Sequence, residues 1–182
     1  MNAKSSSLKP FGFIMLFGGA LLLLFAVQDF FAQSNGLSEQ EIEIFLKTAN
    51  NQPGENTTTE DFMEFQNEVQ ASHAWQLRAI GLVITGLGLG LGATFCFKGQ
   101  LPGLKIAGVT SGIGLITSVW ASMSIKSLAQ AHLGANLHLT YSIWVFLFGG
   151  CHAFFVAIAS YGIISHHSEV EIVFDSEAEL GA

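Results

Sequence analysis

The sequence predicts an all-α integral membrane protein: a four-helix bundle with a helical outer loop between its first and second helices. Only 12% of the 182 residues are charged and half are apolar, whereas a soluble domain carries about 25% charged residues. Four blocks, 10–28, 79–97, 106–125 and 139–165, contain no Asp, Glu, Lys or Arg. Each is close to the roughly 20 residues that a helix needs to cross ~30 Å of hydrocarbon. We expect one domain over 1–182, with spans at about 10–31, 77–97, 104–125 and 139–165.

The first span could also be a secretory signal, because Lys4 and Lys9 precede it. Its apolar run is longer than the roughly 7–15 residues of a signal core. Phe30 stands where a cleavage site before Ala32 would need a small residue. We therefore expect an uncleaved membrane helix.

The second span contains four glycines at alternate positions in "GLGLGLG". A nucleotide-binding loop needs a strand before it and an acidic residue about 20 positions after it, and the next acid is Glu169. On a helix, these glycines form two small-xxx-small pairs on nearly opposite faces, a pattern that allows close helix packing in membranes. We expect this helix to be central, with packing at Gly86, Gly88, Gly90 and Gly92.

Small residues also recur at four-residue intervals in the other spans. The third span has Thr110, Gly114, Ser118 and Ser122, and the fourth has Gly149, Ala153 and Ala157. These stripes predict close helix packing.

The outer loop, 33–76, shows helical signals. Ser38 and Glu41 have the spacing of a capping box, and a second helix is expected to start near Thr58. No helix breaker follows between 61 and 97, so we expect the second span to project out of the bilayer as one continuous helix. The shorter helix would fold against it, with Trp75 at headgroup level.

Basic residues next to the spans favour the cytoplasmic side. Lys4 and Lys9 precede the first span, and Lys98 and Lys105 flank the short turn between the second and third spans. The sequence therefore predicts that both termini are cytoplasmic, including the acidic tail 166–182, and that the acidic loop lies outside.

Three histidines, His138, His152 and His166, recur every 14 residues in the fourth span. Four helical turns separate successive members, which places them near one face. Histidines spaced in this way can ligate haem b, but the other spans contain none to supply a second axial ligand. A neutral His152 bonded to a neighbouring Ser or Thr is the simpler interpretation, and a haem or proton site is the alternative.

Three charges, Asp29, Arg78 and Lys126, lie at the outer boundary of the spans, where charges pair or extend toward water. We expect a structural clamp there. No metal site is expected, since the segment 50–61 lacks the final glutamate of a calcium loop. Cys96 and Cys151 lie in spans, so no disulfide framework is expected either.

These features favour a non-enzymatic tetraspan protein that acts as an accessory subunit of a larger membrane complex. Its expected partners are the lipid bilayer and other membrane subunits or copies of itself, and no basic patch suggests nucleic acid. A haem-binding redox subunit is one alternative. A small homo-oligomeric channel or transporter, lined by the Ser/Thr stripe of the third span, is the other.

Overall fold

The computed structural model describes the backbone of residues 8–51 and 56–180, with side chains as far as residue 166. These residues form six helices and no strand: α1 (Lys9–Ser34), α2 (Glu39–Ala49), α3 (Thr59–Ala71), α4 (Ala74–Phe97), α5 (Pro102–His132) and α6 (Ala135–Leu180). Helices α1, α4, α5 and the Ala135–His166 part of α6 are long and apolar enough to cross a membrane. The predicted all-helical chain with four apolar spans is thus confirmed, and it is compatible with an integral multi-pass protein.

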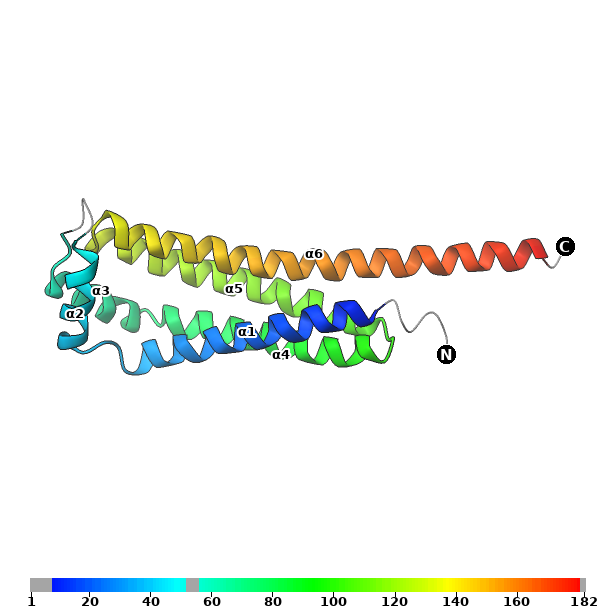
Figure 1. Cartoon of the computed structure of the whole chain (residues 1–182), viewed down its shortest axis with the longest axis horizontal. Helices are drawn as coiled ribbons and strands as arrows, with labels where there is room; N and C mark the ends of the chain where they lie inside the picture. Colours follow the sequence, from blue (N-terminus) through cyan, green and yellow to red (C-terminus); the bar gives the residue numbers. More distant parts are fainter. Residues whose placement is uncertain (1–7, 52–55, 181–182) are drawn as a thin grey trace.

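The four long helices lie side by side, with α2 and α3 at one end (Figure 1). Helix α4 packs against both α1 and α5, and α5 packs against α6. Half of the most apolar window of α4 is buried, against 28–33% for the other three spans. Helix α4 is therefore the most enclosed of the four. Helix α6 continues well past the others, and it ends on the side opposite α2 and α3.

A tight turn joins α4 to α5. The amide of Gln100 donates to the carbonyl of Phe95 and the amide of Gly99 donates to that of Cys96, which is the hydrogen-bond pattern of a Schellman motif. Gly99 has φ 70°, a left-handed conformation that glycine adopts without steric cost. Pro102 then starts α5, where its missing amide proton removes no helical hydrogen bond.

The expectation of one continuous helix from the loop into the second span is wrong. Helix α3 ends at Ala71 and α4 begins at Ala74, because His73 adopts a left-handed conformation with φ 55°. Ser72 stabilises the break: its hydroxyl donates to the carbonyl of Val69 and accepts from the amide of Ala74. The sequence "QASHAW" contains neither Gly nor Pro, so no strong local signal marked this turn.

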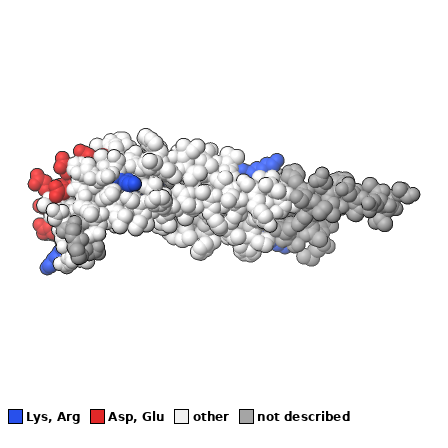
Figure 2. All heavy atoms as spheres, turned by 90° about the horizontal axis from the view of Figure 1, so that it is seen from above, with Lys and Arg blue, Asp and Glu red and all other residues white. Residues whose placement is uncertain are grey.

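Both helices at the α2–α3 end start with a capping box. Ser38 and Glu41 cap α2, as predicted, and Thr58 and Asp61 cap α3. Acidic side chains gather at this end of the molecule, and basic side chains lie both at this end, where α2 carries Lys47, and toward the opposite end (Figure 2). The structure therefore concentrates the acidic residues, but not the basic ones, at one end of the long axis. The orientation itself stays a prediction.

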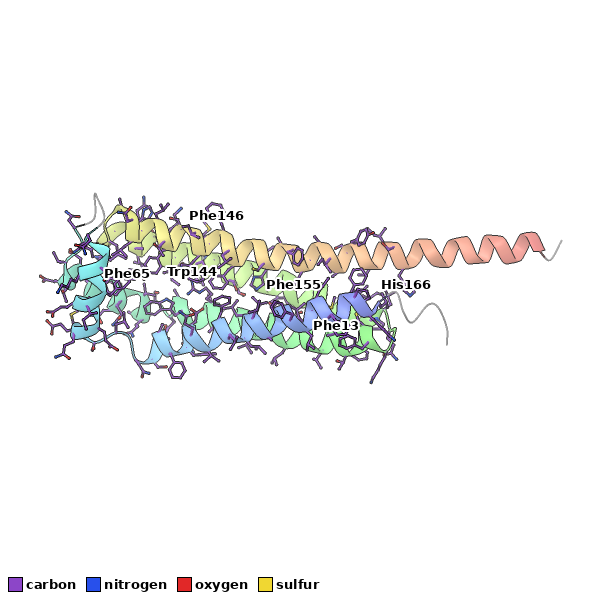
Figure 3. The ribbon with its side chains drawn as sticks, in the orientation of Figure 1. Phe13, Phe65, Trp144, Phe146, Phe155 and His166 are labelled. Atoms are coloured by element: carbon purple, nitrogen blue, oxygen red, sulfur yellow. The ribbon has the colours of Figure 1, made fainter. Side chains whose placement is uncertain are left out.

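The buried side chains form two hydrophobic clusters. One lies among the long helices and includes Met15, Leu89 and Phe155. The other joins α2 and α3 to the nearby ends of α4, α5 and α6, and is centred on Phe65. Figure 3 shows Phe65 on α3, Trp144 and Phe155 on the inner side of α6, and Phe146 pointing away from the rest of the chain.

Candidate functional site: an aromatic cavity above a buried ion pair

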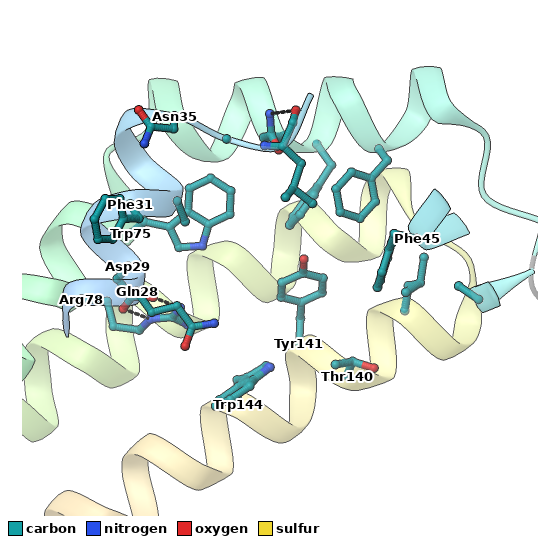
Figure 4. Close-up of a pocket in the computed structure, with 18 of the residues that line it drawn as sticks. Gln28, Asp29, Phe31, Asn35, Phe45, Trp75, Arg78, Thr140, Tyr141 and Trp144 are labelled. Carbon is teal, nitrogen blue, oxygen red and sulfur yellow. Dashed lines mark hydrogen bonds and ion pairs between the residues drawn. The ribbon is translucent and has the colours of Figure 1, made fainter. Parts of the chain in front are cut away.

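A cavity of about 900 Å³ lies where α2 and α3 meet the ends of α1, α4 and α6 (Figure 4). Its volume is in the range of pockets that hold small molecules. Nine aromatic side chains line it: Phe25, Phe31, Phe45, Phe62, Phe65, Trp75, Tyr141, Trp144 and Phe148. We call this space the aromatic cavity.

The mouth and the floor of the aromatic cavity differ in exposure. Exposed side chains at the mouth come from three helices, for example Phe31 of α1, Phe45 of α2 and Thr140 of α6. Buried side chains line the floor, among them Phe65 and Phe148. The cavity thus leads from the surface to the interior of the chain.

A buried ion pair forms part of the floor. Nε of Arg78 donates to Oδ2 of Asp29 at 2.8 Å, and Nη2 donates to Oδ1 at 2.6 Å. The guanidinium also lies over the ring of Phe148, 4.8 Å from its centroid. This two-pronged geometry is the strong form of an Arg–carboxylate contact. Among the described side chains Lys126 makes no ion pair, so the structure joins two of the three predicted boundary charges.

Aromatic contacts close the aromatic cavity toward the middle of the spans. The ring of Phe25 on α1 contacts those of Trp144 and Phe148 on α6, with centroid distances of 5.9 and 5.6 Å. Further along, the ring of Phe155 lies directly against Gly18, whose missing side chain leaves room for it. The space between α1 and α6 is therefore a blind pocket at one end of the helices.

The glycines of α4 lie in different surroundings. A Cβ built on Gly86 would meet the carbonyl oxygen of Gly19 in α1 at 3.0 Å, and one on Gly92 would meet that of Gly103 in α5 at 2.7 Å. A Cβ on Gly88 would collide with Thr110 of α5. These three glycines lie where two helix backbones approach closely.

The structure differs from the prediction at Gly90, where an added Cβ has no heavy atom within 4 Å. An i, i+4 row drifts about 40° per step around a helix of 3.6 residues per turn. A Cβ added to Gly19 of α1 would meet Gly86, Leu89 and, at 3.5 Å, the backbone nitrogen of Gly90. The backbone of Gly90 therefore lies near α1, but an added side chain would point away from it.

The small residues predicted to pack on α5 and α6 also differ in whether they contact a neighbouring helix. Gly114 and Ser118 on α5 are fully or almost fully buried, and a Cβ on Gly114 would meet Thr85 and His152. On α6, a Cβ built on Gly149 would lie 3.3 Å from the side chain of Val119 in α5, whereas Ala153 is exposed. The predicted packing role of Ala153 therefore has no counterpart within this chain.

His152 is completely buried between α5 and α6. Its Nδ1 lies 2.7 Å from the carbonyl of Phe148, one turn back on the same helix, and its Nε2 has no hydrogen-bond partner among the described residues. The position of an added Cβ on Gly114 is only 2.6 Å from Nε2. A haem iron could reach this nitrogen only if α5 and α6 separated.

The other two histidines have separate surroundings on α6. His138 lies 3.5 Å from the hydroxyl of Ser142, and His166 is half-buried near the end of the described side chains. The described residues contain no group of three His, Cys, Asp or Glu that could hold a metal. The Asn50–Asp61 segment considered for calcium includes residues 52–55, which lie outside the described part.

Sequence reasoning identified the charges on the cavity floor but missed the cavity itself. Trp144, Tyr141 and Phe148 look like ordinary aromatic residues of an apolar span. Their clustering at one end of the fourth span was an available signal, because aromatic residues gather at membrane interfaces. Only the fold brings them next to Phe25 of α1 and Phe65 of α3.

Comparisons of this chain with protein-family models, with curated proteins and with solved structures gave no match. The aromatic cavity is therefore interpreted from its own residues.

Proposed function

We propose that this protein is a non-enzymatic, four-span membrane protein that binds a small amphipathic molecule of the bilayer in its aromatic cavity. The observation that carries the proposal is the cavity of about 900 Å³ with nine aromatic lining residues. Its mouth includes Phe31, 63% exposed, on a helix apolar enough to span a membrane. Aromatic walls with a few polar groups are typical of small-molecule sites.

The shape of the aromatic cavity favours a lipid-sized ligand over a helix of another protein. A partner helix that crosses the bilayer would need a groove along the whole of α1 and α6. The contacts of Phe25 with Trp144 and of Phe155 with Gly18 close this space beyond the cavity. A chain or ring that enters from one end fits the pocket better.

An accessory role in a larger complex remains part of the proposal. Helix α6 turns a face of small residues, Gly150, Ala153 and Ala157, away from the rest of the chain, and a Cβ on Gly150 would meet nothing within 4 Å. Small residues on an uncovered face allow close approach of another membrane helix. In this proposal the lipid site and the α6 face belong to a bundle with its termini in the cytoplasm.

The channel alternative has little support in the geometry. Ser118 and Ser122 of α5 are 0 and 1% exposed, because they face the neighbouring helices of the same chain. A pore between copies would need this stripe on the outside.

The test is purification in mild detergent followed by native mass spectrometry of the protein and its bound lipids. Thr140→Trp places a bulky ring at the mouth of the aromatic cavity. Ser160→Trp is the matched control: both residues are exposed on α6, and both hydroxyls donate to the carbonyl four residues earlier.

We expect wild type and Ser160→Trp to retain bound lipid and Thr140→Trp to lose it. Equal retention by both variants would refute the cavity as the binding site. Other protein chains in the same spectra would identify the complex, and their loss on Ala153→Leu would assign them to the α6 face.

A further inference from the structure

The floor of the aromatic cavity contains hydrogen-bond donors without partners. Arg78 uses Nε and Nη2 for Asp29, and one face of its guanidinium lies over Phe148. Its Nη1 group makes no hydrogen bond to the described residues, and it is not among their fully enclosed polar atoms. Because Arg78 lines the cavity, this edge of the guanidinium is the part left for a ligand.

Three aromatic side chains add donors of the same kind. Within the described chain, the hydroxyl of Tyr141 and the indole N–H groups of Trp75 and Trp144 form no hydrogen bond, and none of these atoms is fully enclosed. All three residues line the cavity, and Figure 4 shows them around the Arg78–Asp29 pair. An indole nitrogen can only donate, and a phenol can donate or accept. The floor therefore offers four donor groups.

Acceptors on the floor are fewer. Each carboxylate oxygen of Asp29 already accepts a bond from Arg78. A ligand that covers these donors buries them, and a buried donor without an acceptor costs free energy. A ligand that supplies oxygen acceptors at this depth is therefore favoured over a pure hydrocarbon. The aromatic walls above suit the apolar part of such a ligand.

The charge of the ligand follows from two observations. Asp29 neutralises Arg78 in the floor. The neighbouring helices α2 and α3 carry seven acidic residues and one lysine, so they repel an anionic headgroup. A ligand without net charge avoids this repulsion, whereas a cationic headgroup would place its charge against the Arg78 guanidinium and the other donor groups of the floor.

We infer that the aromatic cavity selects a lipid without net charge whose headgroup presents oxygen acceptors, such as ester carbonyl or zwitterionic phosphate oxygens, to Arg78, Tyr141, Trp75 and Trp144. This inference rests on the proposed lipid-binding function, and it names the class of lipid. The acyl chains lie against the phenylalanines, and the acceptor oxygens lie on the floor.

The test reconstitutes the purified protein with each of four probes and measures the amount retained per chain by native mass spectrometry. Phosphatidylcholine is zwitterionic, diacylglycerol offers ester oxygens without phosphate, and phosphatidylglycerol is anionic. Squalene serves as the hydrocarbon without acceptors. Tyr141→Phe removes one hydroxyl and keeps the ring, while Tyr161→Phe is the control on the exposed face of α6.

We expect phosphatidylcholine or diacylglycerol to be retained above phosphatidylglycerol and squalene. A comparison of phosphatidylcholine with diacylglycerol shows whether the floor of the cavity binds phosphate oxygens or ester oxygens. Loss of one hydrogen bond should weaken retention of the preferred lipid about fivefold in Tyr141→Phe, with no change in Tyr161→Phe. Unchanged melting temperatures show that both variants are folded.

Preferential retention of phosphatidylglycerol would overturn the inferred headgroup charge. Equal retention of squalene and phosphatidylcholine, unaffected by Tyr141→Phe, would overturn the acceptor requirement but leave the proposed apolar binding intact. Failure of Thr140→Trp to reduce any retention would overturn the proposed function as well.

Discussion

Asp29 and Arg78 are the only charged side chains that are buried among the described residues. Each compensates the other through two hydrogen bonds. Removal of one partner from a buried pair leaves an unpaired charge, which costs far more than removal of both. The loss of stability therefore depends on whether Asp29 or Arg78 is replaced alone or both are replaced together.

Asp29→Leu should lower the free energy of unfolding by about 3–5 kcal/mol. The double change Asp29→Leu with Arg78→Met should recover most of this loss, because no unpaired charge remains. Chemical unfolding in detergent micelles measures both, with Lys126→Met as a control for loss of an unpaired boundary charge. A double variant as unstable as the single one would contradict this account of the pair.

Local hydrogen bonds in the capping box of α3 lower the pKa of Asp61. The hydroxyl of Thr58 and then its backbone amide donate to the Asp61 carboxylate, and these two hydrogen bonds hold the pKa of Asp61 below its ordinary value. A carboxyl group with a lowered pKa stabilises the folded state above the unfolded pKa of about 3.9, and this stabilisation is lost as the pH falls through the folded pKa. Helix α3 should therefore loosen first at its capped end in acid.

An NMR titration of the Asp61 carboxyl carbon checks this. Thr58→Ala should raise the Asp61 pKa toward the ordinary value, whereas Thr58→Ser should preserve the shift because serine keeps the hydroxyl. Identical titration curves for Thr58→Ala and wild type would show that the capping box does not form.

His152 has one ring nitrogen with a hydrogen bond and one without. The carbonyl of Phe148 that accepts from its Nδ1 is also the helical acceptor of residue 152, so it keeps a partner when the imidazole is removed. Loss of the imidazole also removes Nε2, which is buried without a partner. His152→Leu should change the free energy of unfolding by less than about 1 kcal/mol. A variant that melts like wild type but loses lipid binding or its partner chains would give His152 a functional role.

At the scale of helices, α4 shows that residue type alone does not define a contact. Gly86 lies against α1, Gly88 and Gly92 lie against α5, and Gly90 faces no neighbour. The same alternating motif therefore contains glycines that leave no room for a side chain and one that does. The paths of α1 and α5 across α4 decide which of these glycines contacts a neighbouring helix.

Gly88→Leu should destabilise the protein by about 1–3 kcal/mol, the usual cost of overpacking, because its Cβ would collide with Thr110. Gly90→Leu should stay within about 0.5 kcal/mol of wild type, as a substitution without close neighbours. Unfolding in detergent separates the two. Equal destabilisation would mean that Gly90 contacts another chain or that α1 follows a different path.

At the scale of the molecule, the acidic side chains gather at one end. Acidic side chains surround α2 and α3, and the turn that carries Lys98 lies at the far end of α4 (Figures 1 and 2). Basic segments next to membrane spans remain on the cytoplasmic side. The α2–α3 end is therefore predicted to face outward.

Single cysteines introduced by Asn51→Cys and Gly99→Cys should be labelled by a membrane-impermeant reagent from opposite sides, Asn51→Cys from outside. Wild type measures the background of Cys96, which is buried, and of Cys151, which is half-buried. Labelling of both variants from the same side would rule out the four-span arrangement, and the reverse order would invert the predicted orientation.

The sequence by itself determined the helical class, the four apolar spans, the capping box of α2 and the approximate start of α3, because hydrophobic length and capping are properties of contiguous residues. It also marked Asp29 and Arg78 as charges at a span boundary. The break between α3 and α4 at His73 was not predicted, because it depends on a left-handed backbone conformation at a position with no Gly or Pro nearby. Only the tertiary structure decided three features: the ion pair between Asp29 and Arg78, the open space beside Gly90, and the aromatic cavity. Each joins or separates residues far apart in the chain, and the relative paths of α1, α4 and α6 set those distances.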